Sequence, residues 1–304
     1  MKRSVLALAF LVISACAFAD ESDGSISSGI SVEQSTPVTS LEAGETTSPV
    51  SESPSEEQPL LLVPIGISLA TTQGCSDCTE SLVNIFAEFV EIQLGRPVDI
   101  EYRFLNQTIH ADQPIETEKL LNDLREWDAM REAISEADIV VVDIGYNDTP
   151  WNRFDDPCGV APDFPIVNWS GLTRECMTEV AEDHRGFLDL VLAEIDALRA
   201  GKPTAVRVVT VYNSTIGNTV DASWDSPDAV EPTVYGNDLF VEIECEEASS
   251  HGAACADVYH VFNGSDGRAA AEDYLAPDYT HLNRVGHITV ARILADIGLE
   301  QLQP

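Results

Sequence analysis

From Leu60 onward, short apolar runs rich in Val and Ile alternate with longer amphipathic stretches, and this alternation constrains the fold more than any other feature. Connections long enough to hold a helix between successive strands are typical of a parallel sheet covered on both faces. The sequence therefore predicts a three-layer α/β/α sandwich around a mostly parallel five-stranded sheet. The predicted strands are 60–68, 98–105, 137–146, 204–212 and 256–262. The predicted helices are 79–94, 116–136, 173–200, one within 225–249, and 284–298.

The N-terminal part of the chain has a different composition. Residues 1–19 begin with basic residues and continue into an apolar stretch too short to span a bilayer, which predicts a signal peptide. The sequence Ile-Ser-Ala-Cys at 13–16 resembles a bacterial lipobox and would make Cys16 a lipidation site, whereas the following Ala-Phe-Ala suits ordinary cleavage. Residues 20–58 lack Lys, Arg and aromatic residues, so we expect a disordered acidic linker before a folded domain at 59–304.

The cysteine count agrees with export. Without Cys16, six of the seven cysteines remain, an even number that can pair fully in an oxidising compartment. Spacing alone does not select a connectivity, and local pairing is the simplest hypothesis: Cys75 with Cys78, Cys158 with Cys176, and Cys245 with Cys255. The Cys75–Cys78 spacing also occurs in redox and zinc motifs. A structural disulfide is favoured because a second CxxC is absent, and we expect no metal site.

The formal net charge is −36, from 16 Lys and Arg against 52 Asp and Glu. Such a charge repels nucleic acid and anionic membrane surfaces, so we expect neither as a partner. We expect a monomer that is exported, either to the outer face of a membrane through an N-terminal lipid anchor or as a secreted protein.

Polar residues follow two predicted strands and precede the last predicted helix. Ser68 follows the first strand, Asn147 follows the third, and Asp278 and His281 lie just before the helix. Nucleophilic catalysis by serine requires an imidazole to take the hydroxyl proton and a carboxylate to orient that imidazole. Ser68, His281 and Asp278 are therefore a candidate catalytic triad. The Ser68 backbone N–H and the Asn147 amide are candidate donors to an oxyanion.

These residues resemble the motifs of a known family, the SGNH or GDSL hydrolases. Gly-Ile-Ser at 66–68 is similar to the family's GDS block, Gly-Tyr-Asn-Asp at 145–148 to its GxND block, and Asp-Tyr-Thr-His at 278–281 to its DxxH block. The resemblance extends over nearly all of 60–304. It implies a flavodoxin-like α/β/α fold and a carboxylic ester hydrolase without a cofactor. It also implies a small-molecule or carbohydrate ester as substrate, for example a short-chain ester or an acetylated sugar.

Two departures from the family pattern leave other functions open. Ile67 replaces the aspartate of the first block, and the stretch 106–114, which corresponds to the second block, contains no glycine. Ala111 or Asp112 would then supply the additional oxyanion donor through its backbone. A catalytically weak or silent surface binding protein is the main alternative, and an acetyl transferase is a narrower one. The α/β-hydrolase family fits poorly, because its GxSxG motif would need glycine where Ala70 stands.

The remaining polar residues have structural interpretations. Asp148 is expected to shape its loop, His110 to be a hydrogen-bonded loop residue, and His287 to be a packed helix residue. The acidic run at 242–247 is expected to be a solvated face. The three tryptophans of the long loops are expected to anchor those loops rather than to stack on a sugar: Trp151, Trp169 and Trp224.

Overall fold

The computed structural model describes residues 58–109, 116–161, 166–219, 224 and 226–303. The predicted signal peptide with its lipobox, and the predicted linker up to residue 57, lie outside the described residues. So do His110, Ala111 and Asp112. The expectations for those residues therefore remain predictions.

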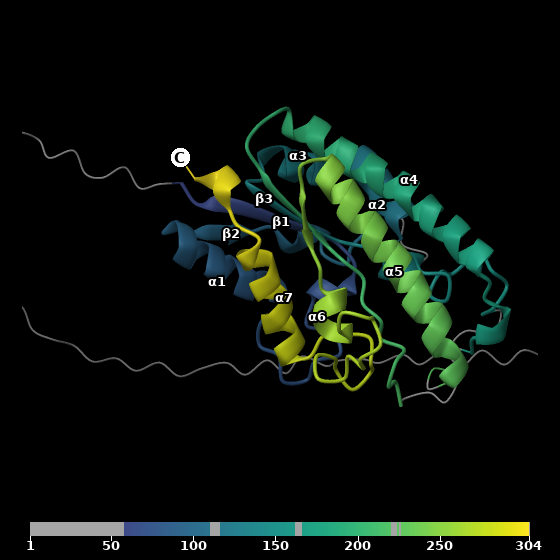
Figure 1. Cartoon of the computed structure of the whole chain (residues 1–304). Helices are drawn as coiled ribbons and strands as arrows, with labels where there is room; N and C mark the ends of the chain where they lie inside the picture. Colours follow the sequence, from purple (N-terminus) through teal and green to yellow (C-terminus); the bar gives the residue numbers. More distant parts are fainter. Residues whose placement is uncertain (1–57, 110–115, 162–165, 220–223, 225, 304) are drawn as a thin grey trace, which may run out of the picture. The chain divides into compact units, whose positions relative to one another are not determined.

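Five parallel strands form one sheet in the described part of the chain, in the order β2-β1-β3-β4-β5. Figure 1 labels three of them, β1, β2 and β3. The chain moves from β1 to β2 in one direction and then crosses back to β3, β4 and β5 on the other side of β1. This is the doubly wound arrangement, which confirms the predicted α/β class. The strands are β1 (Leu60–Gly66), β2 (Val98–Ile100), β3 (Ile139–Asp143), β4 (Ala205–Val209) and β5 (Ala254–Ala256).

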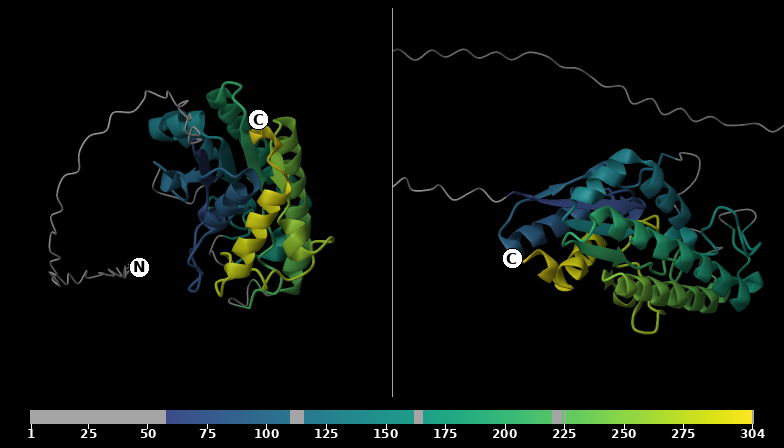
Figure 2. Two further views of the ribbon diagram at one scale, coloured as in Figure 1. Left: turned by 90° about the vertical axis from the view of Figure 1, so that its left-hand side faces the viewer. Right: turned by 90° about the horizontal axis from the view of Figure 1, so that it is seen from above.

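Helices cover both faces of this sheet. α1 packs against α7, whereas α2 and α3 pack with α4, which runs beside α5 (Figure 2). Right-handed crossovers explain why α1 lies on one face of the sheet and α2 to α5 on the other. The connection from β1 to β2 runs across the sheet in the opposite direction from the later connections. The helices are α1 (Leu82–Leu94), α2 (Thr117–Glu126), α3 (Asp128–Glu136), α4 (Arg174–Arg199), α5 (Pro227–Ser250), α6 (Tyr259–Asn263) and α7 (Arg284–Asp296).

The two central strands are almost fully buried. Every residue of β3 is buried, and in β1 only Leu61 is partly exposed. Their near-continuous apolar sequence is what two helical layers require. Pro64 lies within β1 although proline cannot donate to a sheet ladder. β1 pairs with β2 only from Leu60 to Leu62, so on that side no strand needs the N–H that Pro64 lacks.

The strand predicted at 256–262 is wrong over most of its length. β5 ends at Ala256, and α6 begins at Tyr259. The Thr210 hydroxyl accepts the Val258 and Tyr259 N–H groups at 2.9 and 3.3 Å, which satisfies two donors at the start of a short helix. A short apolar run fits a buried helix as well as a strand, and periodicity alone does not separate the two.

The helix predicted at 116–136 is divided at Trp127. The backbone of Trp127 is extended, with φ −92° and ψ 95°, so that α2 ends and α3 begins there. Its indole ring packs edge-on against Phe104, with 5.0 Å between ring centroids. The tertiary contact of a large aromatic ring thus overrides the continuous helical pattern of the sequence.

Among the residues that the structure describes, three disulfides have the predicted local pairing: Cys75–Cys78, Cys158–Cys176 and Cys245–Cys255. The first precedes α1, the second joins the loop after β3 to the first turn of α4, and the third joins α5 to β5. In the part of the chain that the structure describes, no helix combines the length and the apolar character that crossing a membrane requires.

Candidate active site

Two short 3₁₀ turns follow the carboxyl ends of the neighbouring strands β1 and β3. Ser68 opens the turn Ser68–Ala70, and Asn147 is the middle residue of the turn Tyr146–Asp148. β1 and β3 are paired in register up to their last residues. Because the strands are parallel, both turns leave the sheet at the same edge. The structure thus brings Ser68 and Asn147, which are far apart in the sequence, to adjacent strand ends.

The turn before α7 completes a hydrogen-bonded chain from serine to carboxylate. Ser68 Oγ lies 3.0 Å from His281 Nε2, and His281 Nδ1 lies 2.7 Å from Asp278 Oδ2. Asp278 Oδ1 accepts the backbone N–H groups of Thr280 and His281, each at 3.0 Å. Burial favours the neutral acid, but these hydrogen bonds outweigh it and lower the pKa of Asp278. The carboxylate is therefore ionised where the imidazole needs an acceptor.

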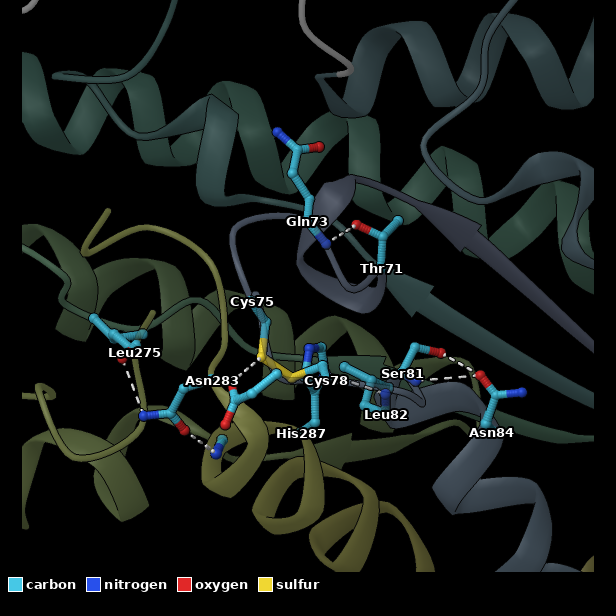
Figure 3. Close-up of a disulfide and its surroundings, with 12 residues drawn as sticks. Thr71, Gln73, Cys75, Cys78, Ser81, Leu82, Asn84, Leu275, Asn283 and His287 are labelled. Carbon is cyan, nitrogen blue, oxygen red and sulfur yellow. Dashed lines mark hydrogen bonds between the residues drawn. A yellow bond between two sulfur atoms is a disulfide. The ribbon is translucent and has the colours of Figure 1, made fainter. Parts of the chain in front are cut away.

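Two other loops hold this turn in place. Tyr212 Oη donates to the Thr280 carbonyl at 2.5 Å. Gly74 has φ 76° and lies so close to Asp278 that a Cβ at this position would overlap the carboxylate. The Cys75–Cys78 disulfide follows Gly74 directly and closes a short loop before α1 (Figure 3). The disulfide therefore restrains the segment that packs against the candidate dyad.

A second Asp-x-x-His pair shows that the spacing alone does not make a site. His260 Nδ1 lies 2.7 Å from Asp257 Oδ2, and the His260 N–H donates to Asp257 Oδ1 at 3.0 Å. These are the same contacts that join His281 and Asp278. Among the described hydrogen bonds, however, no serine hydroxyl meets the ring of His260. The bond to Ser68 is what distinguishes His281.

The turn that carries Ser68 is held without the aspartate that Ile67 replaces. Ile67 is buried in the core, and its N–H donates to the Asp143 carbonyl at 2.8 Å. Thr71 donates both its N–H and its hydroxyl to the Ser68 carbonyl, at 2.9 and 2.6 Å. The side chain of Asp143 accepts the Ala70 N–H. A carboxyl group at the end of β3 thus contacts the turn where the family pattern would supply one from within it.

Asp143 is a neutral acid at neutral pH. Complete burial raises the pKa of Asp143 to about 8, the Ala70 N–H opposes this shift, and the nearby Glu244 adds to it. Asp143 Oδ2 is buried without a hydrogen-bond partner among the described residues, which disfavours the charged form further.

Two of the four candidate oxyanion donors, Ser68 and Asn147, are among the residues that the structure describes. Ser68 is the first residue of its 3₁₀ turn, where the N–H groups find no acceptor within the turn itself. Asn147 is partly exposed beside the neighbouring strand end. Ala111 and Asp112 lie outside the described residues, so their backbone donors stay a prediction.

Asp148 has the structural role expected, but its partners are remote rather than local. Its carboxylate accepts the Thr117 N–H at 3.0 and 3.2 Å and the Thr117 hydroxyl at 2.9 Å. It thereby caps the first turn of α2. His287 is a packed helix residue, as predicted: it is fully buried, and its Nδ1 accepts the Leu82 N–H at the start of α1 (Figure 3).

The three loop tryptophans form a buried cluster with apolar residues of the long loops. The ring centroids of Trp151 and Trp169 lie 6.1 Å apart, and those of Trp169 and Trp224 lie 5.4 Å apart. Their exposed fractions are 3, 4 and 9%. The prediction that they anchor loops is therefore confirmed.

The prediction that 242–247 is a solvated face is wrong at Glu244, which is fully buried. The side chain of Glu244 points to α4, where its Oε1 lies 3.5 Å from His184 Nε2. Sequence reasoning missed His184 and Asp143 as well. One signal was present, because His184 is spaced four residues from both Val180 and Leu188, which are buried on the same helix.

Two groups of side chains have metal-ligating chemistry in the described part of the chain: Cys75, Asp77 and Cys78, and Asp189, Glu247 and His251. The cysteines are joined in a disulfide and do not offer thiolates. Both ring nitrogens of His251 already lie 3.0 Å from carboxylates, those of Asp189 and Asp196. Ion pairing accounts for the second group.

No protein-family model and no curated protein matches the sequence. Solved structures do match the fold. A lipase from a goat rumen metagenome aligns over 79% of this chain and 98% of its own, with a TM-score of 0.58 and 18% identity. A protein from Parabacteroides merdae described as a GDSL-like lipase aligns over 79% and 95%, with a TM-score of 0.51 and 12% identity.

An acetyl-xylooligosaccharide esterase from Geobacillus aligns over 81% of this chain and 97% of its own, with a TM-score of 0.51 and 16% identity. At such low identity these similarities concern the fold. The chain thus has the same three-layer fold as these lipases and esterases.

Asp143 makes the stability of the protein depend on pH. An unfolded aspartate ionises near pH 4. Between about pH 4 and about pH 8 the unfolded chain has lost a proton that folded Asp143 retains, so the free energy of unfolding falls as pH rises. Asp143→Asn mimics the neutral acid and removes this titration. We expect the free energy of unfolding of the wild type, relative to this variant, to decline by up to about 1.4 kcal/mol per pH unit between pH 5 and 7.

Urea unfolding of both proteins at several pH values measures this difference, and the comparison cancels the other carboxylates. A difference that stays constant from pH 5 to pH 8 would show that folded Asp143 is already ionised.

Proposed function

We propose that this protein is a serine hydrolase of the SGNH type that cleaves carboxylic esters. The observation that carries the proposal is the continuous hydrogen-bonded chain from Ser68 Oγ through His281 to Asp278 at the carboxyl edge of the sheet. The fold, which is shared with known lipases and esterases, supports it.

In the first half of the reaction, Ser68 Oγ attacks the carbonyl carbon of the ester while His281 Nε2 takes the hydroxyl proton. The carbonyl π electrons move to oxygen, and the Ser68 N–H and the Asn147 amide stabilise the resulting oxyanion. Asp278 stabilises the imidazolium. When the intermediate collapses, the ester C–O bond breaks, and the alcohol leaves with the proton from His281.

In the second half, His281 takes a proton from water, which attacks the acyl group on Ser68. A second oxyanion forms in the same place and collapses. The bond to Ser68 Oγ breaks, the serine regains its proton from His281, and the carboxylic acid is released. Each step uses residues of this chain and requires no cofactor.

The candidate substrates follow from the similar structures and from the charge of the chain. The matched structures include lipases and an acetyl-xylooligosaccharide esterase, and short-chain esters or acetylated carbohydrates are therefore the first candidates. The strongly negative net charge favours neutral or cationic substrates over anionic ones. We propose that the protein acts as a monomer.

A catalytically silent binding protein is the competing function, and Ile67 is its main support. Two observations count against it. Ser68 and His281 have kept hydrogen-bonding geometry, and Asp143 supplies a carboxyl group to the nucleophile turn from the neighbouring strand. A protein without catalysis would need neither.

We also propose that the protein is exported. Three disulfides persist most readily in an oxidising compartment. Cys16 would be the lipidated N-terminal residue of the mature protein and would tether the domain to the outer face of a membrane.

Hydrolysis of a p-nitrophenyl acetate or butyrate by the purified chain tests the catalytic proposal. Ser68→Ala and His281→Ala should each lower kcat/KM by at least about 10³-fold, because each removes the nucleophile or its base. Asn147→Ala should lower kcat by about 10² to 10³-fold through the loss of one oxyanion donor.

His260→Ala is the matched control, since His260 has the same contacts to an aspartate three residues earlier without the bond to a serine. It should keep wild-type activity. Equal rates for the wild type and Ser68→Ala would reject the esterase proposal.

The anchor has its own test. Expressed in a bacterium with a lipoprotein pathway, the full chain should sediment with membranes and incorporate labelled fatty acid, whereas Cys16→Ser should do neither. Membrane retention of the Cys16→Ser chain would reject lipidation at this residue.

A further inference from the structure

A buried carboxylate lies directly behind the turn that carries Asn147. Gly145, with φ 104°, begins this turn, and a Cβ at Gly145 would overlap Glu244 Oε1. The other oxygen of Glu244 accepts the Val211 N–H at 3.0 Å, just beyond the end of β4. Glu244 on α5 therefore touches the turn and is itself fixed to the neighbouring strand end.

The far end of the same turn is held by a second set of polar contacts. The Asp148 carboxylate accepts the Thr117 hydroxyl, and Thr117 Oγ1 lies 3.0 Å from His184 Nδ1. The other nitrogen of His184, Nε2, lies at the ion-pair distance of 3.5 Å from Glu244 Oε1, and neither atom has a hydrogen bond among the described residues. These contacts link Asp148, at one end of the turn, through Thr117 and His184 to Glu244, which packs against Gly145 at the other end.

The cluster formed by Glu244, His184, Thr117 and Asp148 is deeply buried, and this burial raises the pKa of Glu244 while the neighbouring His184 opposes the shift. Glu244, Thr117 and His184 are at most 1% exposed, and the His184 ring stacks on Phe240 with 4.8 Å between ring centroids. Burial disfavours the imidazolium, but the carboxylates of Asp148 and Glu244 outweigh it and raise the pKa of His184 to about 9. The histidine is thus a cation between two acids.

Stability alone does not account for such a cluster. Replacement of a buried ion pair by apolar residues of similar volume is often neutral or stabilising. Apolar residues of α4 and α5 pack in the same region, among them Val180, Val241 and Phe240. An apolar replacement would lack the hydrogen bonds that link Asp148 to Thr117 and His184, and the polar side chain of Glu244 that packs against Gly145.

We propose that His184 and Glu244 are positioning residues that hold the 145–148 turn so that Asn147 is aligned with the oxyanion. They act through the turn and do not touch the substrate. This inference rests on the proposed esterase function, because it assigns a role within the same site.

Glu244→Gln is the most selective variant. Its amide keeps the size of the side chain and an oxygen that can accept the Val211 N–H, but it removes the charge opposite His184. We expect kcat for a p-nitrophenyl ester to fall by about tenfold or more, with KM within about threefold of wild type, because a misplaced donor weakens transition-state binding.

A double-mutant cycle with Asn147→Ala separates positioning from a general loss of stability. If Glu244 acts through Asn147, Glu244→Gln should change kcat by less than about twofold once the Asn147 amide is absent. Glu247→Gln is the matched control: Glu247 lies on the same helix and pairs with Arg185 on α4, away from the turn. It should keep wild-type kcat.

Two results would overturn the inference: kcat of Glu244→Gln within about twofold of wild type, or an equal loss in both backgrounds. If circular dichroism shows that Glu244→Gln does not fold, His184→Gln replaces it in the double-mutant cycle with Asn147→Ala. The same changes in kcat are then expected. The proposed function is tested separately, by comparing ester hydrolysis by the wild type and by Ser68→Ala. That comparison does not involve Glu244 and is independent of the double-mutant cycle.

Discussion

The parallel pairing of β1 with β3 is the constraint on which the candidate site depends. It sets Gly66 opposite Asp143, and the approach is so close that a Cβ at Gly66 would overlap the Asp143 carbonyl. From that point the two chains diverge into the turns that carry Ser68 and Asn147. Because no side chain separates the two backbones, the ends of β1 and β3 fix the turns of Ser68 and Asn147 next to each other.

Two buried acids, Asp143 and Glu244, pack against the turns of Ser68 and Asn147 on the side of the protein core. The Asp143 side chain accepts the Ala70 N–H in the turn of Ser68, and Glu244 packs against Gly145 at the start of the turn of Asn147. The Coulombic repulsion between the two acids contributes to the raised pKa of Asp143. His184 supplies the compensating positive charge from α4. The helical layer thus supports the site as well as covering the sheet.

Much of the fold could be predicted from the sequence because its signals are local. Doubly covered strands are continuously apolar, amphipathic helices have a period near 3.6, and both patterns are visible within one segment. The prediction failed where a tertiary contact decides the structure. Trp127 breaks a continuous helical pattern to pack on Phe104, and Thr210 caps a short helix where an apolar run predicted a strand.

In the candidate site, too, local motifs could be predicted from the sequence and tertiary contacts could not. Ser68, Asn147, Asp278 and His281 could be proposed because their motifs occur in order along the chain. The role of Asp143 could not be, because its contact with the Ser68 turn depends on which strands are neighbours. Glu244 lies in an acidic run that predicts a solvent-exposed face, and it is buried because α5 packs on α4.

Covalent labelling shows whether Ser68 is a nucleophile activated by His281. Incubation of the purified chain with a fluorophosphonate, followed by mass spectrometry of the digested protein, locates the phosphonyl group. We expect one adduct on the peptide that contains Ser68, absent from Ser68→Ala and strongly reduced in His281→Ala. A wild-type protein that stays unlabelled, or a label on another residue, would contradict this expectation.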